Sequence, residues 1–449
     1  MSFNFLPNTA LAACVNDAGE IFTYAQAYNG ELVEIKGKLA GNPATYEVTG
    51  DQTGIGLTKE SGSAPAKRFT PLAAINSKSI YYNAKRLVFF VDKQNYLRDI
   101  YFNGTKWVEG ELYDQRWQCA PYSKLAAVRL VNHGGYDFVC LYYQDTSETG
   151  NIVLVNHSPT YKWQTGNPPL DDPPLVGTAL TAVPPQPGIE VIRYNSPTDT
   201  DDPVVFFQYD KLELGSSQDQ GPNDYATYSI NDKTITLSAH SAITAVDDKT
   251  NFWAFYTTDL QNQIFRLKVD ASGAVTQPQP VVLPNNPIPG SSLASIIVKG
   301  SPDVVVLFYL LHYEPVKETT QEINVFAATL TAKSGGVDAW DVNGGVCLTA
   351  GNSSLSDSGS GGGDDGNPGG DHDGGDDDGA MVASLVGLGM EVMTMGVMTG
   401  LEMTTAFPLT GMRGRTVGAV ADLLDIRRMD AGGLGGFDYC GFAFALMME

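Results

Sequence analysis

The chain has few of the residues that build metal centres, disulfide frameworks or catalytic dyads. It contains 5 cysteines and 5 histidines in 449 residues, and their spacing matches no zinc or redox motif. A nucleophile elbow, a phosphate-binding loop and a dinucleotide fingerprint are all missing. We therefore expect no metal, no cofactor and no enzymatic activity, and we expect the scattered cysteines to be reduced and buried.

Basic residues are also scarce, with 28 Lys and Arg against 51 Asp and Glu and a net charge of −23. An acidic surface repels nucleic acid backbones and anionic membranes, so we expect neither as a partner. The apolar run 380–400 is long enough to span a bilayer, but it contains Glu391 and lacks aromatic or basic anchors. The first residues lack the basic and long apolar regions of a secretory signal, which predicts a cytoplasmic or non-classically exported protein.

Methionine is missing between Met1 and Met381, whereas the last part of the chain is rich in it. Residues 351–379 consist mainly of Gly, Asp and Ser, a composition that predicts a disordered acidic linker without an ordered calcium site. Residues 380–449 form a tail rich in Met and Gly, which is either disordered or translated in the wrong reading frame. An Asp-rich tract written with GAT codons yields the Met codon ATG when it is read one base late.

Residues 1–350 contain a short motif of small apolar residues that recurs six times. It begins at Thr9, Thr70, Ser123, Thr178, Ser241 and Ser291, at intervals of 50 to 63 residues. Each copy is followed by a short aromatic strand, such as LVFFVD from Leu87 or VVFFQY from Val204. A period near fifty residues suits four short strands and their turns, which predicts an all-β, six-bladed β-propeller over residues 1–350. A two-sheet sandwich remains the alternative.

The stretch Thr70 to Leu112 shows one such unit in full. The pattern predicts strands at Pro71–Ile75, Leu87–Asp92 and Tyr96–Phe102, an Asn103-Gly104 turn and a last strand from Trp107. In this repeat, TPLAAI, LVFFVDKQNYLRD and NGTKW resemble a blade of the fungal fucose-specific lectins of the Aleuria type. The resemblance implies carbohydrate binding between adjacent blades, by an arginine on the second strand, a glutamate on the third and a nearby aromatic side chain.

Aligned on this pattern, none of the six copies has arginine at the arginine position. The six residues there are Phe22, Leu87, Cys140, Val204, Trp253 and Val306. Arg86 lies one residue away and is expected to point to the other face of its strand. The acid position falls on Glu34, Asp99, Leu154 and Arg266 in blades one, two, three and five, and the alignment leaves the fourth and sixth blades open.

The candidate sugar-binding residues are therefore two acids and three aromatic side chains. Glu34 and Asp99 are candidate acceptors for sugar hydroxyls, and Trp107, Trp163 and Trp253 are candidate stacking platforms. For each of the five there is a structural alternative, namely a solvated acid or a tryptophan packed between blades. The predicted function is a lectin-like propeller with degenerate or altered glycan sites, acting as a possible homo-oligomer. A protein-interaction scaffold is the first alternative, and a glycosidase with paired carboxylates is the second.

Overall fold

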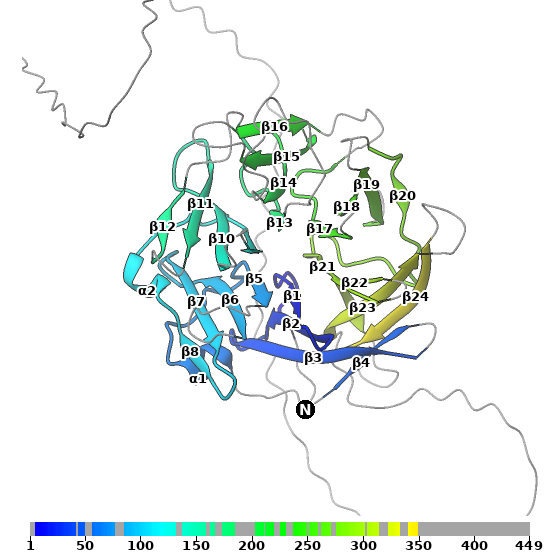
Figure 1. Cartoon of the computed structure of the whole chain (residues 1–449), viewed down its shortest axis with the longest axis horizontal. Helices are drawn as coiled ribbons and strands as arrows, with labels where there is room; N and C mark the ends of the chain where they lie inside the picture. The colour runs from blue at the N-terminus through cyan, green and yellow to red at the C-terminus, as the bar shows by residue number, and fades with distance from the viewer. Residues whose placement is uncertain are drawn as a thin grey trace, which may run out of the picture. The chain divides into compact units, whose positions relative to one another are not determined.

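Six four-stranded antiparallel sheets are arranged as blades around a common centre, as Figure 1 shows. Each blade is built from four consecutive strands, so the predicted all-β, six-bladed propeller is confirmed. The computed structural model of the protein describes residues 5–41, 44–49, 56–76, 85–131, 137–158, 162–166, 173–184, 203–210, 212–219, 225–229, 237–248, 251–258, 262–270, 275–300, 303–313, 322–332 and 340–348.

Within each blade, strands that are consecutive in the sequence are also neighbours in the sheet, and the first strand lies nearest the centre of the ring. Blade 1 consists of β1 (Ala12–Val15), β2 (Glu20–Gln26), β3 (Leu32–Ala40) and β4 (Thr45–Val48). Blade 2 consists of β5 (Ala73–Asn76), β6 (Arg86–Val91), β7 (Leu97–Phe102) and β8 (Trp107–Glu109). Blade 3 consists of β9 (Leu125–Val131), β10 (Asp137–Gln144), β11 (Ile152–His157) and β12 (Gln164–Thr165).

The second half of the ring follows the same plan. Blade 4 consists of β13 (Thr181–Val183), β14 (Val204–Gln208), β15 (Leu214–Asp219) and β16 (Tyr225–Ser229). Blade 5 consists of β17 (Ile243–Asp247), β18 (Asn251–Thr257), β19 (Ile264–Asp270) and β20 (Gln279–Pro280). Blade 6 consists of β21 (Ala294–Val298), β22 (Val304–Tyr313), β23 (Glu322–Ala332) and β24 (Trp340–Cys347). Two one-turn helices, α1 (Leu57–Ser61) and α2 (Leu112–Gln115), lie in connections.

Side-chain size explains which strand lies where in a blade. The six recurring motifs supply β1, β5, β9, β13, β17 and β21, whose small residues line a central cavity of about 940 Å³. The second strands are buried on both faces between neighbouring blades; every residue of β6 and of β14 is buried. A strand covered on both faces needs a continuous apolar run rather than an alternating one, and the sequence supplies it. In blade 2 the predicted strands lie within two residues of the observed ones.

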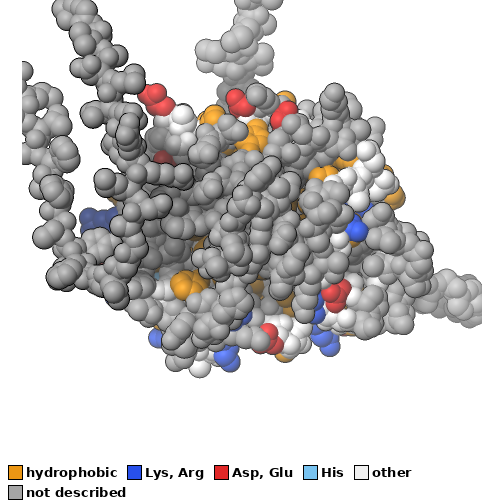
Figure 2. All heavy atoms as spheres, turned by 45° about the horizontal axis from the view of Figure 1, so that its top comes forward, with side chains coloured by type: hydrophobic (Ala, Val, Ile, Leu, Met, Phe, Trp, Pro, Cys, Tyr) orange, Lys and Arg blue, Asp and Glu red, His pale blue; other side chains and the backbone are white. Residues whose placement is uncertain are grey.

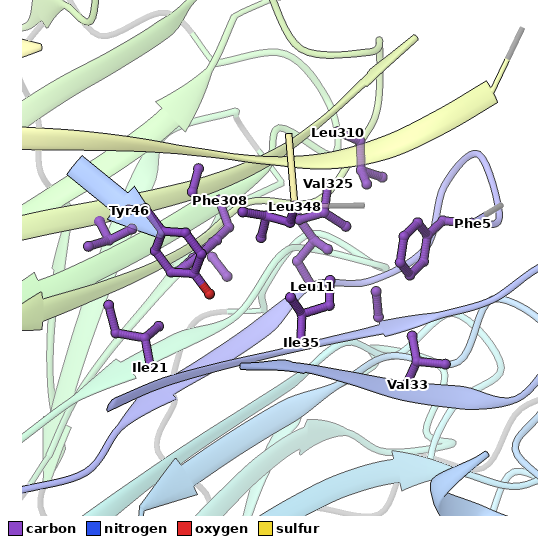
Figure 3. Packing of buried hydrophobic residues seen from close by; sticks show 14 of the residues in the cluster. Phe5, Leu11, Ile21, Val33, Ile35, Tyr46, Phe308, Leu310, Val325 and Leu348 are labelled. Atoms are coloured by element: carbon purple, nitrogen blue, oxygen red, sulfur yellow. The ribbon is translucent and has the colours of Figure 1, made fainter. Parts of the chain in front are cut away.

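The ring is closed by side-chain packing between the first and last blades. Figure 3 shows Phe5, Ile21 and Tyr46 packed with Phe308 and Val325, all within one buried apolar cluster. The Phe5 amide donates a 3.4 Å hydrogen bond to the Ile323 carbonyl. Because the two ends of the repeat array meet directly, blade 1 has the same kind of neighbours as every other blade.

Three glutamines form a recurring hydrogen-bonded link from one blade to the next. In each case the amide nitrogen of the glutamine donates to a backbone carbonyl in the turn that precedes the next inner strand, and its oxygen accepts a backbone N–H from the same turn. Gln26 contacts Lys67 and Phe69, Gln144 contacts Leu175 and Gly177, and Gln208 contacts Ser238 and His240. The links satisfy buried turn groups and fix each blade against its neighbour.

The remaining features of the fold are the surface charges, the cysteines and the division of the chain into two units. On the face seen in Figure 2, acidic side chains lie among Lys and Arg side chains along the lower edge. Cys14, Cys119, Cys140 and Cys347 are free thiols, and Cys440 lies outside the described residues. The chain divides into the unit Met1–Gly359 and the unit Ser360–Glu449. The described part ends at residue 348, so the linker 351–379 and the tail 380–449 remain predictions.

Candidate functional site

Backbone pairing inside each blade defines the acid position on all six third strands. The position lies opposite an aromatic residue of the second strand. The pairs are Tyr24 with Glu34, Phe89 with Asp99, Tyr142 with Leu154, Phe206 with Ser216, Phe255 with Arg266 and Phe308 with Ala327. The four residues assigned from the sequence occupy equivalent places in their blades, and Ser216 and Ala327 are their equivalents in the two blades left open. Only blades 1 and 2 therefore carry a carboxylate there.

Glu34 is the centre of a polar cluster between blades 1 and 2. Its carboxylate accepts hydrogen bonds from Arg86 Nε at 3.0 Å, from a second guanidinium nitrogen of Arg86 at 3.2 Å and from the Tyr24 hydroxyl at 2.8 Å. The side chains of Arg86 and Glu34 are 10% and 15% exposed. A two-point contact between a guanidinium and a carboxylate is among the strongest hydrogen-bonded pairs in proteins. We call Tyr24, Glu34, Arg86 and Trp107 the Glu34 cluster.

Aromatic rings enclose the guanidinium of Arg86. Its central carbon lies 3.9 Å from the ring centre of Phe22, 4.2 Å from that of Phe102 and 5.6 Å from that of Trp107. Tyr24 meets Trp107 edge to face with 6.1 Å between ring centres. Cation–π attraction and the carboxylate together stabilise a charge that would otherwise be costly to bury.

The electrostatics of the cluster follow from this enclosure. Burial raises the pKa of Tyr24 well above its usual value, and the neighbouring Glu34 carboxylate raises it further. Burial also raises the pKa of the nearby Cys14 thiol to about 12. Burial alone would lower the pKa of Arg86, but Tyr24, Glu34 and Cys14 outweigh it and raise that pKa. Glu34 therefore faces a permanent cation and two neutral groups at physiological pH.

The position of Arg86 explains how an arginine reaches the cluster although no blade carries one at the arginine position. Arg86 alternates with Val88 and Phe90 along β6, so it shares their face, which packs against blade 1. Arg86 and Leu87 point to opposite faces of β6, as predicted. On its face, Arg86 contacts Glu34 of the preceding blade. Sequence reasoning missed this partnership because it judged Arg86 only by its register within blade 2 and not by the side chains of blade 1 that the same face meets. The shared face with Val88 and Phe90 was the available signal.

Asp99, the second candidate acid, lies in a different setting. It is 1% exposed, and its Oδ1 accepts a 2.9 Å hydrogen bond from the Leu112 amide, which opens α2. Its Oδ2 is buried without a hydrogen-bond partner among the described residues. Burial raises the pKa of Asp99 to about 7, and Glu111 and Glu109 add to the rise. Asp99 therefore anchors the α2 connection, and the side chain of its sequence neighbour Arg98 pairs with Asp92.

Trp163 occupies in blade 3 the place that Trp107 has in blade 2. It is 4% exposed and meets Phe89 edge to face at 5.9 Å and His157 at 5.5 Å between ring centres. Burial, with a smaller effect from Lys162, lowers the pKa of His157 to about 4, which keeps the ring neutral at physiological pH. These contacts agree with the predicted alternative in which Trp163 packs between blades.

Trp253 lies at the arginine position of blade 5, beside the residue that replaces the acid. The guanidinium carbon of Arg266 and the ammonium of Lys268 lie 5.9 Å and 5.8 Å from its ring centre. Its indole N–H donates a 2.7 Å hydrogen bond to Asp248. The indole is 4% exposed, so this blade presents a buried tryptophan with two cations in place of the acid and arginine of the family pattern.

The structure brings the five candidate residues to three separate blade boundaries. Glu34 and Trp107 meet between blades 1 and 2, Asp99 and Trp163 lie between blades 2 and 3, and Trp253 lies between blades 5 and 6. The described side chains include no group of three or more His, Cys, Asp or Glu that could hold a metal ion. No helix in the described ranges is both long enough and apolar enough to cross a bilayer.

Comparisons with known proteins agree with this architecture. A fucose-specific lectin from Aleuria aurantia is 30% identical over 142 residues, which cover 30% of this chain and 43% of that lectin. The matched region thus spans less than half the length of that relative. A crystal structure of the Aleuria aurantia lectin, a six-bladed β-propeller, superposes with a TM-score of 0.57 at 19% identity and covers 78% of this chain and 99% of the lectin.

A second solved lectin has the same fold. AofleA from Arthrobotrys oligospora superposes with a TM-score of 0.54 at 14% identity, covering 78% of this chain and 89% of that protein. At these identities the structural likeness shows the fold and not the ligand. The sequence profile described as fungal fucose-specific lectin matches residues 6–316, and the chain therefore belongs to the fungal fucose-specific lectin family.

Proposed function

We propose that the protein binds a glycan through a single altered site at the boundary of blades 1 and 2, centred on the Glu34 cluster. The observation that carries the proposal is the meeting of a carboxylate, a guanidinium and an indole at this boundary. A carboxylate accepts hydrogen bonds from sugar hydroxyls, a guanidinium donates to them, and an indole packs on the apolar patch of a sugar ring.

Membership of a lectin family supports carbohydrate as the ligand class. The Aleuria aurantia lectin has been solved with α-methyl-L-fucoside and with Fucα1-6GlcNAc, so fucosylated glycans are the first ligands to test here. Lectins bind carbohydrates without converting them, which favours a binding role over an enzymatic one.

The specificity of the site is proposed to differ from the family pattern. The resemblance implies an arginine on the second strand and a glutamate on the third, whereas here Phe22 holds the arginine position of blade 1 and Arg86 reaches across from blade 2. The guanidinium lies against the rings of Phe22 and Phe102 and contacts Glu34 from the neighbouring blade, so the two charged groups come from different blades. We therefore expect the preferred sugar to differ from fucose in the arrangement of its hydroxyl groups, because the two charged groups come from different blades.

The other boundaries have lost the polar pair in different ways. At the acid position Leu154 and Ala327 are apolar, Ser216 is short and uncharged, and Arg266 reverses the charge. A chain with one weak site binds a multivalent surface with high avidity only when several copies are joined and bind together. We therefore include assembly of several copies in the proposal.

A scaffold that binds proteins and no sugar is the second candidate. The observation in its favour is the closure of the Glu34 cluster, since Trp107 is 4% exposed and the Arg86 guanidinium carbon lies 3.9 Å and 4.2 Å from the ring centres of Phe22 and Phe102. In that case the Arg86 and Glu34 pair serves only to hold blade 1 against blade 2.

A glycan array probed with the full chain separates the two candidates. The proposal expects binding to a restricted set of glycans that is lost in Glu34→Ala and kept in Asp303→Asn, a change at an exposed ion pair with Lys299. Absence of any signal above background for the folded protein, displayed on a multivalent support, favours the scaffold. Signal that survives Glu34→Ala places the glycan elsewhere and contradicts the proposed site.

A further inference from the structure

Asparagine is followed directly by glycine at three places in the chain, and the three lie in different settings. Asn29-Gly30 and Asn103-Gly104 lie in surface turns, whereas Asn343-Gly344 lies within β24. At an Asn-Gly pair the glycine amide nitrogen can reach the asparagine side chain most easily, because glycine has no side chain to hinder the approach. The surroundings of each pair then decide whether the two groups react.

The turn between β7 and β8 holds the Asn103 side chain by its carbonyl oxygen. This Oδ1 accepts hydrogen bonds from the Thr105 amide at 3.0 Å, from the Thr105 hydroxyl at 2.8 Å and from the Lys106 amide at 3.0 Å. Three donors on one carbonyl oxygen stabilise the negative charge that develops there when a nucleophile adds to the carbonyl carbon. The turn therefore forms an oxyanion hole for an attack on the Cγ atom of Asn103.

Gly104 supplies the nucleophile for this attack. Its φ is +102°, a conformation that a residue with a side chain rarely adopts, and it is exposed to solvent. Its amide donates no hydrogen bond to any group that the structure describes. A Cβ atom built on Gly104 would lie 3.6 Å from Nζ of Lys85, so an ammonium group is close to this amide. A nearby cation favours loss of the amide proton, which makes the nitrogen reactive.

The turn between β2 and β3 contains the same dipeptide without these features. The Gly30 amide donates a 2.8 Å hydrogen bond to the Ala27 carbonyl, so its nitrogen is already engaged. Oδ1 of Asn29 accepts one hydrogen bond, 3.0 Å from the Glu31 amide. An attack on Asn29 would have to break the first bond and would gain one oxyanion donor in place of three.

We propose that Asn103 is a site of spontaneous covalent modification, at which the turn converts asparagine to a mixture of aspartate and isoaspartate. The Gly104 nitrogen loses its proton to water and bonds to Cγ of Asn103. The bond from Cγ to Nδ2 breaks, and the side-chain nitrogen leaves as ammonia. Water then adds to either carbonyl carbon of the five-membered imide. One opening gives aspartate, and the other gives isoaspartate, in which the main chain runs through Cβ and Cγ.

The modification lies beside the Glu34 cluster. Phe102 and Trp107 flank the turn and pair across β7 and β8, and the rings of both lie close to the Arg86 guanidinium. Isoaspartate lengthens the main chain by one carbon between Phe102 and Trp107, which disturbs their pairing. The isoaspartate form is therefore expected to hold Arg86 less firmly and to unfold at a lower urea concentration than the parent.

Peptide mapping of the full chain after incubation at pH 8 tests the proposal. Trypsin releases Asn103 in the peptide Asp99–Lys106, and mass spectrometry measures the gain in mass as the side-chain amide becomes a carboxyl group. In the folded chain, Asn103 should react about tenfold faster than Asn29. In the chain unfolded by urea, the two should react at equal rates, because both precede glycine. Equal rates in the folded chain, or a faster reaction at Asn29, overturn the proposal.

Two variants test the oxyanion hole. Thr105→Val removes the hydroxyl donor and keeps the shape of the side chain, and it should slow the reaction of Asn103 about threefold or more. Thr45→Val removes an exposed hydroxyl that donates to the Ala40 carbonyl in another turn, and it is the matched control that should change nothing. A rate in folded Thr105→Val equal to that of the parent contradicts the role of the turn.

The effect on the Glu34 cluster has its own test. Ion exchange separates the isoaspartate form, which carries one more negative charge, and urea unfolding compares it with the unmodified chain. Asn103→Gln, incubated in the same way, controls for changes elsewhere in the chain. An isoaspartate form as stable as the unmodified chain overturns the proposed effect on the cluster.

Discussion

Arg86 and Glu34 pair across a blade boundary, with the guanidinium of one blade forming two hydrogen bonds to the carboxylate of the preceding blade. This pair has two consequences. It joins blades 1 and 2 by a charged contact that the other described boundaries lack in this form, and it places hydrogen-bonding groups at the boundary where the family resemblance implies a sugar. Structure and proposed function therefore depend on the same two side chains.

Breaking the pair should destabilise the fold. Arg86→Met leaves Glu34 largely buried with Tyr24 as its remaining partner, and the loss of one member of a buried pair costs about 3 kcal/mol. Urea unfolding of the parent and the variant measures the difference. Lys36→Met removes an ion pair with Glu20 that is 41% and 38% exposed, so it should change stability by less than about 1 kcal/mol. Equal effects of the two changes would show that burial of the Arg86 pair contributes nothing.

The glutamine links should each contribute to holding neighbouring blades together. Gln26→Ala leaves the Lys67 carbonyl and the Phe69 amide without their side-chain partner, as Gln144→Ala does for Leu175 and Gly177. Each change is expected to cost about 1–3 kcal/mol in urea unfolding. Gln118→Ala, at an exposed glutamine with a single 3.2 Å contact, is the control. A cost no larger than that of the control would mean that the links do not stabilise the ring.

Asp99 should make the protein less stable as pH rises from about 4 to about 7. Its pKa in the folded chain is about 7 and its usual value is near 4, so the unfolded chain gives up the proton first over this range. Asp99→Asn removes this loss and should be more stable than the parent at pH 8 by about 2–4 kcal/mol. Thermal melts of both proteins at pH 4 to 8 measure it.

Asp114→Asn, an exposed acid of α2, serves as the control for Asp99 and should leave the pH profile unchanged. Glu109, Glu111 and Tyr101 surround Asp99 and remain present in both variants. A parent profile identical to that of Asp99→Asn would contradict the buried neutral carboxyl.

His157 should act in the opposite direction. Its pKa is about 4 in the folded chain, below the ordinary value near 6.5, so stability present above pH 6.5 is lost as pH falls to about 4. His157→Phe should remove this loss, because phenylalanine has no group that ionises. A phenylalanine ring suits the place, since Phe102 meets Trp107 in blade 2 as His157 meets Trp163 in blade 3. Melts at pH 4 to 8 compare it with His312→Asn, an exposed histidine. A loss of stability at low pH that is unchanged in His157→Phe would refute this origin.

The propeller fold could be predicted from the sequence because each blade repeats the same pattern of small and aromatic residues. Six runs of small residues and six aromatic runs record where strands converge at the centre and where they pack between blades. The same regularity gave the acid position in four blades. The sequence alignment left the fourth and sixth blades open, and the assignment of Ser216 and Ala327 follows only from the strand pairing.

The site was harder to foresee because its members come from two blades. Glu34 and Trp107 were recognised as candidates, but Arg86 and Tyr24 acquire their roles only when blade 1 is packed on blade 2. A pairing between repeats depends on which faces meet in space, and one-dimensional spacing does not specify it. The exposure of Trp107 and Trp253 is likewise decided by neighbouring blades.

The most direct test of the central proposal is the number of glycans bound per chain. Native mass spectrometry of the full chain with the strongest ligand from the array is expected to show one glycan per chain, absent in Glu34→Ala and retained in Asp99→Asn. Two or more glycans per chain, or one that persists in Glu34→Ala, would contradict a single altered site between blades 1 and 2.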